Sequence, residues 1–248
     1  NFQKINPSRT IGISKKNINF FNKHVIDINK FIWKLKKIHI YSDNLKKEKL
    51  INFQDDKDQL FSIIKNFQLH KILKKSLIIN KYYKELKLIE YPKFFDKYNI
   101  VINTDHLNPI TKKFFNKKII KKYNSLAYTC ILDHQIISND TATQIFTKEG
   151  PLAFLPISNK KTSVVYSIKN TKKKDDQIIT DLINKYNFKY KIEKINKIES
   201  FEINSVNLRS YYHKKYLAFG DLLHKIHPLA GQGYNMTIRD IKILLNII

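Results

Sequence analysis

The chain has 248 residues, of which 42% are hydrophobic and 12% aromatic, and this composition excludes a fully disordered chain. Its single cysteine, Cys130, excludes an internal disulfide framework, and no apolar run reaches the ~18 residues that a membrane-spanning helix needs. The net charge of +25 would ordinarily favour a nucleic-acid partner, but arginine, the main base-reading residue, occurs only at positions 9, 209 and 239. We therefore interpret the lysines as a solvated surface, with weak attraction to anionic lipid or nucleic acid as the alternative.

The N-terminal third predicts two helices and a strand. Helical spacing of apolar residues begins in the segment Ser14–Phe21, and Ile38–Tyr41 alternates like a strand. A second helical period occupies Gln59–Leu73, and it follows Asp55 and Asp56, which can cap a helix N-terminus.

The rest of the chain predicts mostly short strands, with a helix at Asp175–Tyr186. The predicted strands are Ser76–Ile79, Leu86–Glu90, Ile100–Asn103, Ser125–Leu132, Thr141–Phe146, Ser163–Ile168 and Glu199–Val206. Mixed strands and helices indicate an α/β or α+β fold. Because the middle is richest in strands, we expect a sheet domain inserted into a flanking α/β unit.

Three of the five glycines gather in one short stretch near the C-terminus, at positions 220, 231 and 233. A buried strand, Tyr216–Phe219, is expected to end there and to present Asp221 at the carboxyl edge of a sheet, where α/β folds bind ligands. Pro228 stiffens the following turn, and glycine lets the backbone approach a planar ligand without a Cβ atom in the way. A helix then begins near residues 233–235, and its N-terminus favours negative charge on that ligand.

This stretch resembles the second flavin-binding motif of the FAD-dependent aromatic-ring monooxygenases, and within them of the ubiquinone-biosynthesis hydroxylases. The motif reads G-D-x-x-H-x-x-H-P-x-x-G-Q-G-x-N-x-x-x-x-D, and the chain meets its fixed positions with Gly220, Asp221, His224, His227, Pro228, Gly231, Gln232, Gly233, Asn235 and Asp240. The resemblance implies that Asp221 binds the ribityl chain of FAD and that the backbone of residues 231–235 faces the pyrimidine end of the flavin. The cofactor-binding residues that it implies are Asp221, Pro228, Gly231, Gln232, Gly233, Tyr234, Asn235 and Arg9.

Weaker similarities extend over most of the chain. Ser8–Ser14 is similar to the family segment R-T-x-A-L-S, in which the arginine, here Arg9, lies near the FAD phosphates or the flavin. Thr147–Pro156 is similar to F-T-x-x-G-P-x-A-x-L-P, a turn and strand of the substrate domain. Asp56–Leu60 stands where the family has a short polar motif that opens a helix beside the cofactor.

Two departures from the family pattern are visible. The first motif, G-x-G-x-x-G, which holds the ADP pyrophosphate, is absent. The middle motif, D-G-x-x-S-x-x-R, has His106, Pro109 and Lys112 in place of its glycine, serine and arginine. We therefore expect an internal fragment of a flavin hydroxylase that does not bind FAD or turn over by itself.

The resemblance also implies an architecture like that of p-hydroxybenzoate hydroxylase, with a Rossmann-like FAD-binding domain and an inserted sheet. Residues 1–37, 53–121 and 211–248 would form the FAD-binding domain, residues 38–52 a strand of the substrate domain, and residues 122–210 the substrate-binding sheet. The implied activity is hydroxylation of a polyprenyl-phenol ring with NAD(P)H and O2. No catalytic side chain and no metal are expected, because the cofactor supplies the chemistry. Such a protein would be cytoplasmic, with peripheral association at the inner membrane surface as an option.

Other interpretations remain open at this point. The protein could be a flavoenzyme of the same family that acts on another aromatic substrate, or an inactive basic protein that binds membrane or nucleic acid. His224 and His227 could instead pack the turn or bind a metal, although zinc would need further ligands. Asp221 could act as a helix cap, and Arg9 could be a surface charge.

Overall fold

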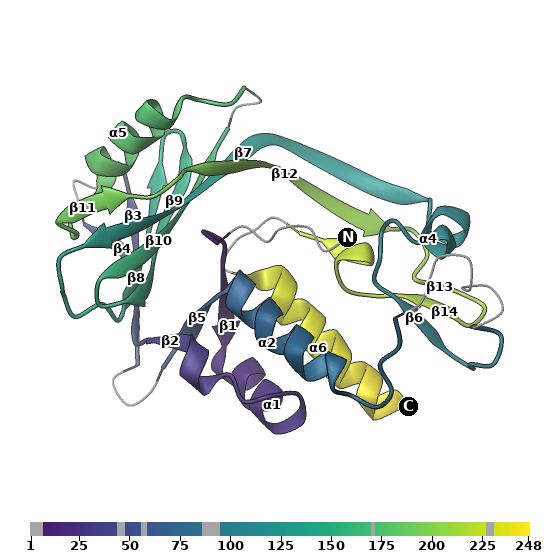
Figure 1. Ribbon diagram of the computed structural model, residues 1–248. Coiled ribbons are helices and arrows are strands. Elements are labelled where there is room, and N and C mark those ends of the chain that lie inside the picture. The colour runs from purple at the N-terminus through teal and green to yellow at the C-terminus, as the bar shows by residue number, and fades with distance from the viewer. Residues whose placement is uncertain (1–6, 44–47, 56–58, 86–94, 170–171, 227–230) are drawn as a thin grey trace. The chain divides into compact units, whose positions relative to one another are not determined.

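The computed structural model describes residues 7–43, 48–55, 59–85, 95–169, 172–226 and 231–248 (Figure 1). These residues divide into two compact units. Unit 1 comprises Asn1–Ile72 and Asn124–Ile203, and unit 2 comprises Leu73–Tyr123 and Asn204–Ile248. The chain therefore passes through each unit twice, and strands β7 and β12 contribute residues to both.

The elements are distributed along the whole chain. The helices are α1 (Lys15–His24), α2 (Asn66–Ile78), α4 (Pro109–Phe114), α5 (Asp176–Tyr186) and α6 (Gln232–Ile247), with 3-10 turns η1 (Asn29–Phe31) and η3 (Gly220–Leu222). The strands are β1 (Thr10–Ser14), β2 (Ile32–Leu35), β3 (Lys37–Ser42), β4 (Lys49–Gln54), β5 (Phe61–Lys65), β6 (Val101–Asn103), β7 (Lys118–His134), β8 (Thr141–Thr147), β9 (Gly150–Ser158), β10 (Lys161–Ile168), β11 (Ile192–Ile195), β12 (Glu199–Leu208), β13 (Tyr212–His213), β14 (Tyr216–Ala218) and β15 (His224–Lys225).

Unit 1 is built on a large sheet. Strands β7, β10, β9 and β8 pair antiparallel in that order, β3 then pairs with β8 in parallel, and β4 closes the edge. A smaller antiparallel sheet has the order β1-β5-β2. Buried Leu35, Ile63 and Ala142 form a common cluster of the two sheets, so β2 and β5 are packed against the larger sheet.

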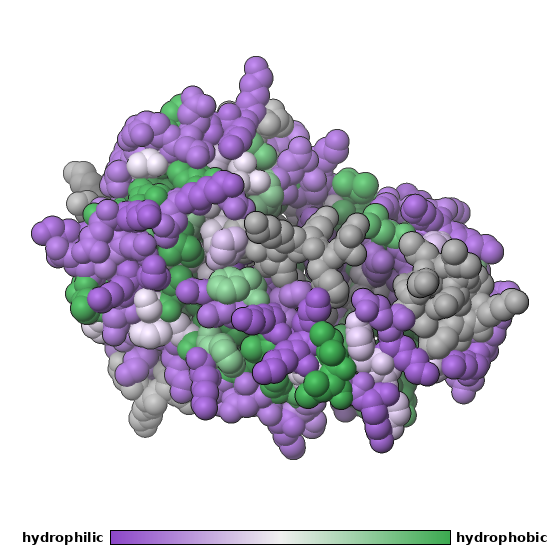
Figure 2. Space-filling model, in the orientation of Figure 1, coloured by the Kyte–Doolittle hydropathy of each residue, from purple (hydrophilic) through white to green (hydrophobic). Residues whose placement is uncertain are grey.

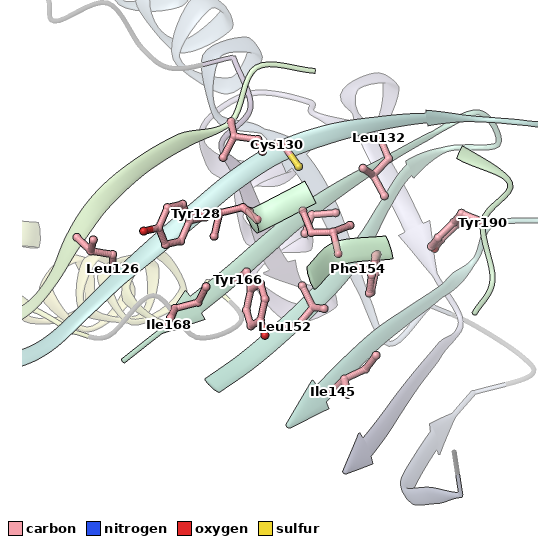
Figure 3. Close-up of a cluster of buried hydrophobic side chains, with 14 of the residues drawn as sticks. Leu126, Tyr128, Cys130, Leu132, Ile145, Leu152, Phe154, Tyr166, Ile168 and Tyr190 are labelled. Carbon is pink, nitrogen blue, oxygen red and sulfur yellow. The ribbon is translucent and has the colours of Figure 1, made fainter. Parts of the chain in front are cut away.

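Helix α5 covers one face of the large sheet. Alternate residues of β7, including Tyr128, Cys130 and Leu132, point into the cluster drawn in Figure 3, as the two-residue period of a strand requires. Ile179 and Ile183 of α5 complete this cluster, and both are almost fully buried. They are four residues apart and therefore lie on one face of the helix, which explains why α5 is amphipathic.

Unit 2 contains a three-stranded sheet with the order β13-β14-β6, in which β14 and β6 are parallel. Its core is small and includes Phe115, Leu208, Ala218 and Leu222. The end of β12 pairs with β15 in the same unit. Strand β14, paired in parallel with β6, thus leads directly into the turn that carries Asp221.

Most predicted elements are confirmed, including α1, α5, α6 and the strands β3, β6, β8, β10, β12 and β14. Two predictions are wrong. Residues 61–65 form strand β5 rather than the start of a helix, and helix α2 continues to Ile78 where a strand was predicted. The predicted strand Leu86–Glu90 and the capping residue Asp56 lie outside the described residues. The assignment of residues 122–210 to a substrate domain stays a prediction.

Hydrophilic side chains cover most of the face shown in Figure 2, in agreement with the lysine-rich composition. Among the residues that the structure describes, no helix combines the length and the apolar character that crossing a bilayer requires.

Candidate functional site

The turn after β14 presents an exposed carboxylate. Phe219 is extended, and its N–H donates to the Asn103 carbonyl at 2.9 Å, which continues the pairing with β6. Gly220 then takes φ +62°, a left-handed conformation that glycine adopts without steric cost, and the chain turns into η3. Asp221 is exposed there, and its carboxylate has no hydrogen-bond or ion-pair partner among the described residues. It is therefore available to accept hydrogen bonds from a ligand, and no helix-capping bond from it is present.

Helix α6 begins at a second left-handed glycine. Gly231 occupies the N-cap position with φ +67°, so no side chain can cap this helix end from there. The Asn235 N–H and its Nδ2 both donate to the Gly231 carbonyl, at 3.2 and 2.9 Å. This double contact fixes the carbonyl and leaves the N–H groups of the first turn directed out of the helix end. The first turn also carries no acidic side chain, so its positive dipole end is not neutralised by a neighbour in that turn.

The Asp221 turn and the start of α6 are packed together within unit 2. A Cβ atom at Gly220 would lie 3.9 Å from Cγ2 of Thr237, and one at Gly233 would lie 3.6 Å from Cγ1 of Ile226. The segment 220–226 therefore runs along the first turns of α6. The predicted residues Asp221, Gly231 and Gly233 accordingly belong to one local arrangement.

The remaining predicted residues of this motif are distributed as follows. Gln232 is exposed at the first helical position, and Tyr234 is partly buried. Burial raises the pKa of the Tyr234 phenol above its ordinary value. Pro228 and His227 lie outside the described residues.

The motif also brings together a histidine and an aspartate whose contact sequence reasoning missed. His224 Nε2 lies 3.6 Å from Asp240 Oδ2, and the two side chains are 14% and 29% exposed. Both residues are fixed positions of the motif, and this was the one feature of the sequence that could have pointed to their contact. Among the described residues there is no group of three or more histidine, cysteine or carboxylate side chains that could hold a metal. The metal interpretation of His224 and His227 includes a residue outside that set.

The altered middle motif forms a regular helix start. The Asn108 side chain accepts a hydrogen bond from the Ile110 N–H at 2.9 Å, and Pro109 occupies the first turn of α4, where its missing N–H costs nothing. The Asp105 carboxylate accepts from the Leu107 N–H at 2.8 Å. Among described non-glycine residues, only Asn124 and Lys214 have positive φ, so His106 does not need glycine's backbone conformation.

Arg9 belongs to unit 1, whereas Asp221 and helix α6 belong to unit 2. Its guanidinium lies over the Phe201 ring, 4.6 Å from the centroid. The flanking residues are anchored to the large sheet by hydroxyl groups, since Ser8 Oγ and Thr129 Oγ1 are 2.9 Å apart and Thr10 Oγ1 donates to Ser163 Oγ at 3.1 Å. Sequence patterns could not predict this hydroxyl cluster, because its members are far apart along the chain.

Comparisons with known proteins found similar sequences among the ubiquinone-biosynthesis hydroxylases. No family model matches the chain. The chain is 22% identical to the mitochondrial ubiquinone biosynthesis monooxygenase COQ6 of Drosophila melanogaster, in an alignment that covers 98% of the chain and 65% of the relative. It is 28% identical to the 3-demethoxyubiquinol 3-hydroxylase of Escherichia coli, over 49% of the chain and 34% of that protein.

Solved structures share the fold. PqsL of Pseudomonas aeruginosa, described as a probable FAD-dependent monooxygenase, has a TM-score of 0.69 at 13% identity, covering 98% of the chain and 77% of PqsL. HpxO of Klebsiella pneumoniae, crystallised with FAD, has a TM-score of 0.68 at 10% identity, covering 96% of the chain and 70% of HpxO. The chain is thus similar in sequence to ubiquinone-biosynthesis hydroxylases and in fold to FAD-dependent monooxygenases. It spans less than two thirds of the length of these curated relatives.

The residues around Asp221 have the chemistry that holding FAD would require. Asp221 offers an exposed acceptor for ribityl hydroxyls, and the first turn of α6 offers amide donors beside a glycine N-cap. Both features are in unit 2 and are packed against each other. The role of each of these residues toward FAD stays a prediction.

Proposed function

We propose that this chain forms part of an FAD-dependent monooxygenase that hydroxylates an aromatic ring, a polyprenyl phenol of ubiquinone biosynthesis, with NAD(P)H and O2. The observation that carries the proposal is the exposed, unpartnered Asp221 carboxylate held against the start of α6. The names of the relatives from Drosophila and Escherichia coli support the choice of substrate.

The residues of unit 2 would divide the work of holding FAD. The Asp221 carboxylate would accept hydrogen bonds from the ribityl hydroxyls, each worth about 1.5–3 kcal/mol for a charged acceptor. The N–H groups of Gln232 and Gly233, with the helix dipole, would stabilise negative charge at the pyrimidine end of the flavin. When bound, FAD supplies the redox chemistry, taking electrons from NAD(P)H and activating O2 for transfer to the ring.

Unit 1 would supply the surface for the substrate. Tyr128 and Phe154 point into the core beneath α5 and are 1% and 2% exposed, so they cannot line a substrate channel. The face of the large sheet opposite α5 carries Thr129 and Ser163. The hydroxyl groups of these two residues form hydrogen bonds with Ser8 and Thr10, which flank Arg9. A polyprenyl substrate would bring the enzyme to a membrane surface, and the net charge of +25 would favour an anionic one.

A second candidate is the hydroxylation of a compact aromatic molecule. It is favoured by the structural neighbours, since PqsL was crystallised with 2-aminobenzoylacetate and HpxO with uric acid. Both candidate functions use the same fold. They differ in the size and polarity of the aromatic substrate.

The test uses the protein expressed from its complete gene. We expect it to purify with a visible flavin spectrum and to oxidise NAD(P)H faster when a short-chain polyprenyl phenol is added, with one oxygen atom gained by the phenol in mass spectrometry. Stimulation by small soluble aromatics alone would favour the second candidate. A colourless protein that takes up no FAD on titration would contradict both.

A further inference from the structure

We propose that His224 and Asp240 act as a positioning pair, which holds the turn that carries Asp221 against helix α6 and thereby sets the affinity for FAD. The inference rests on the proposed function, because FAD is the ligand concerned. It adds two residues that would act through Asp221 and would not touch the cofactor themselves.

The two atoms that face each other in this contact are buried polar atoms. Nε2 of His224 and Oδ2 of Asp240 are both inaccessible to solvent, and neither has a hydrogen-bond partner among the described residues. Their separation of 3.6 Å is too long for a hydrogen bond, so the attraction is that of an ion pair when the imidazole is protonated. Each atom therefore offsets part of the desolvation cost of the other. Replacing one side chain leaves the polar atom of the other buried without an opposite charge.

The pair is well placed to control Asp221. His224 follows Asp221 by three residues, and the intervening Leu223 is fixed by two backbone hydrogen bonds, to Gly220 at 3.0 Å and from Leu208 at 3.1 Å. A displacement of His224 is therefore transmitted through a short, hydrogen-bonded turn to the carboxylate. On the other side, Asp240 lies one helical turn beyond Thr237, the residue that faces Gly220.

Packing alone does not account for this arrangement. The turn also approaches α6 at Gly220 and Gly233, where an added Cβ atom would lie 3.9 Å from Thr237 Cγ2 and 3.6 Å from Ile226 Cγ1, both ordinary van der Waals distances to side-chain carbons. Burying the His224 Nε2 and Asp240 Oδ2 atoms at that place costs desolvation free energy, which an apolar pair would not. The geometry therefore assigns the pair a role in orientation. It would fix the turn that carries Asp221, which would bind the ribityl hydroxyls, relative to helix α6, which would face the flavin.

The experiment measures FAD affinity by fluorescence titration, in the protein expressed from its complete gene. Asp240→Asn keeps the shape and removes the charge, Asp240→Glu keeps the charge and changes the shape, and His224→Gln removes the imidazole. Lys225→Gln and Arg239→Gln are matched controls, because each is an exposed neighbour of one partner. Thermal unfolding of the FAD-free proteins reports whether each variant folds.

We expect Asp240→Asn and His224→Gln each to weaken FAD binding about 10-fold, and the double variant to be no weaker than either, because they remove the same contact. Asp240→Glu should recover most of the affinity, whereas a purely steric role would make the larger Glu worse than Asn. Wild-type affinity in folded Asp240→Asn or His224→Gln would overturn the inference and leave the proposed function intact. If Asp240→Asn does not fold, the FAD affinities of His224→Gln and its control Lys225→Gln are compared, and equal affinities would overturn the inference. A wild-type protein that binds no FAD would overturn the proposed function, and this inference with it.

Discussion

Cys130 is the residue whose ionisation the fold alters most plainly. It lies in the core beneath α5, 1% exposed, and burial raises the pKa of its thiol from 9.0 to about 12. The same burial raises the pKa of Tyr190 to about 12. These groups keep their protons in the folded chain at a pH where the unfolded chain has lost them.

The sign of the resulting pH dependence follows from proton binding. Between the unfolded and folded pKa values the unfolded state binds fewer protons, so the free energy of unfolding falls as the pH rises. Between about pH 8 and pH 10 the thiol alone should contribute a loss on the order of 1 kcal/mol. Urea unfolding of the wild type and of Cys130→Ala at both pH values measures this contribution. An equal pH dependence in the two proteins would contradict the assignment.

At Asp221 and Gly231 the sequence was informative for a physical reason. An unpartnered carboxylate at the end of a parallel strand and a glycine at a helix start are local features, and both are found where the motif indicated. The contact between His224 and Asp240 and the hydroxyl bonds around Arg9 depend on tertiary packing, which short-range patterns do not encode. The cofactor roles of these residues stay predictions.

At the scale of elements, the apolar face of helix α5 was predictable, and strand β5 at the centre of the smaller sheet was not. Helix α5 shows a clear apolar face, and its predicted end at Tyr186 is the observed one. Strand β5 lies between β1 and β2, and Ile63 and Ile64 are both buried, so the alternation that marks a strand is missing. The run Leu77-Ile78-Ile79 has high strand propensity, yet α2 continues through Ile78, which shows how weak such propensities are.

The turn between β8 and β9 provides a test of the fold at this scale. Gly150 has φ +140°, and a Cβ atom there would overlap the carbonyl oxygen of Ser167. Gly150→Ala should therefore lower the free energy of unfolding by about 3 kcal/mol or more, because backbone strain and a clash with main-chain atoms add.

The control for this variant is Gly233→Ala. A Cβ atom at Gly233 would make only ordinary contact, and alanine is favoured in a helix, so the free energy of unfolding should stay the same or rise by up to ~1 kcal/mol. Urea unfolding of both variants makes the comparison. Equal stability of Gly150→Ala and the wild type would show that the turn differs from the one described.

For the whole molecule, the sequence led to the correct fold class because one motif is long and specific. The order of strands in the large sheet, with β3 and β8 parallel among antiparallel neighbours, could not be predicted, since it pairs segments about a hundred residues apart. Solved structures of FAD-dependent monooxygenases share the fold of the chain. Residues 220–240 are the part of the chain on which the proposed function depends.

The most direct test of the central claim is the flavin content of Asp221→Ala. In the protein expressed from its complete gene, we expect this variant to fold like the wild type, because the carboxylate is exposed and has no partner among the described residues. Its FAD affinity should fall at least ~10-fold, as expected for the loss of charged hydrogen bonds worth about 1.4 kcal/mol or more. Visible absorbance after gel filtration measures the retained flavin. Undiminished flavin in the variant would contradict the assignment of Asp221, and with it the account of this site.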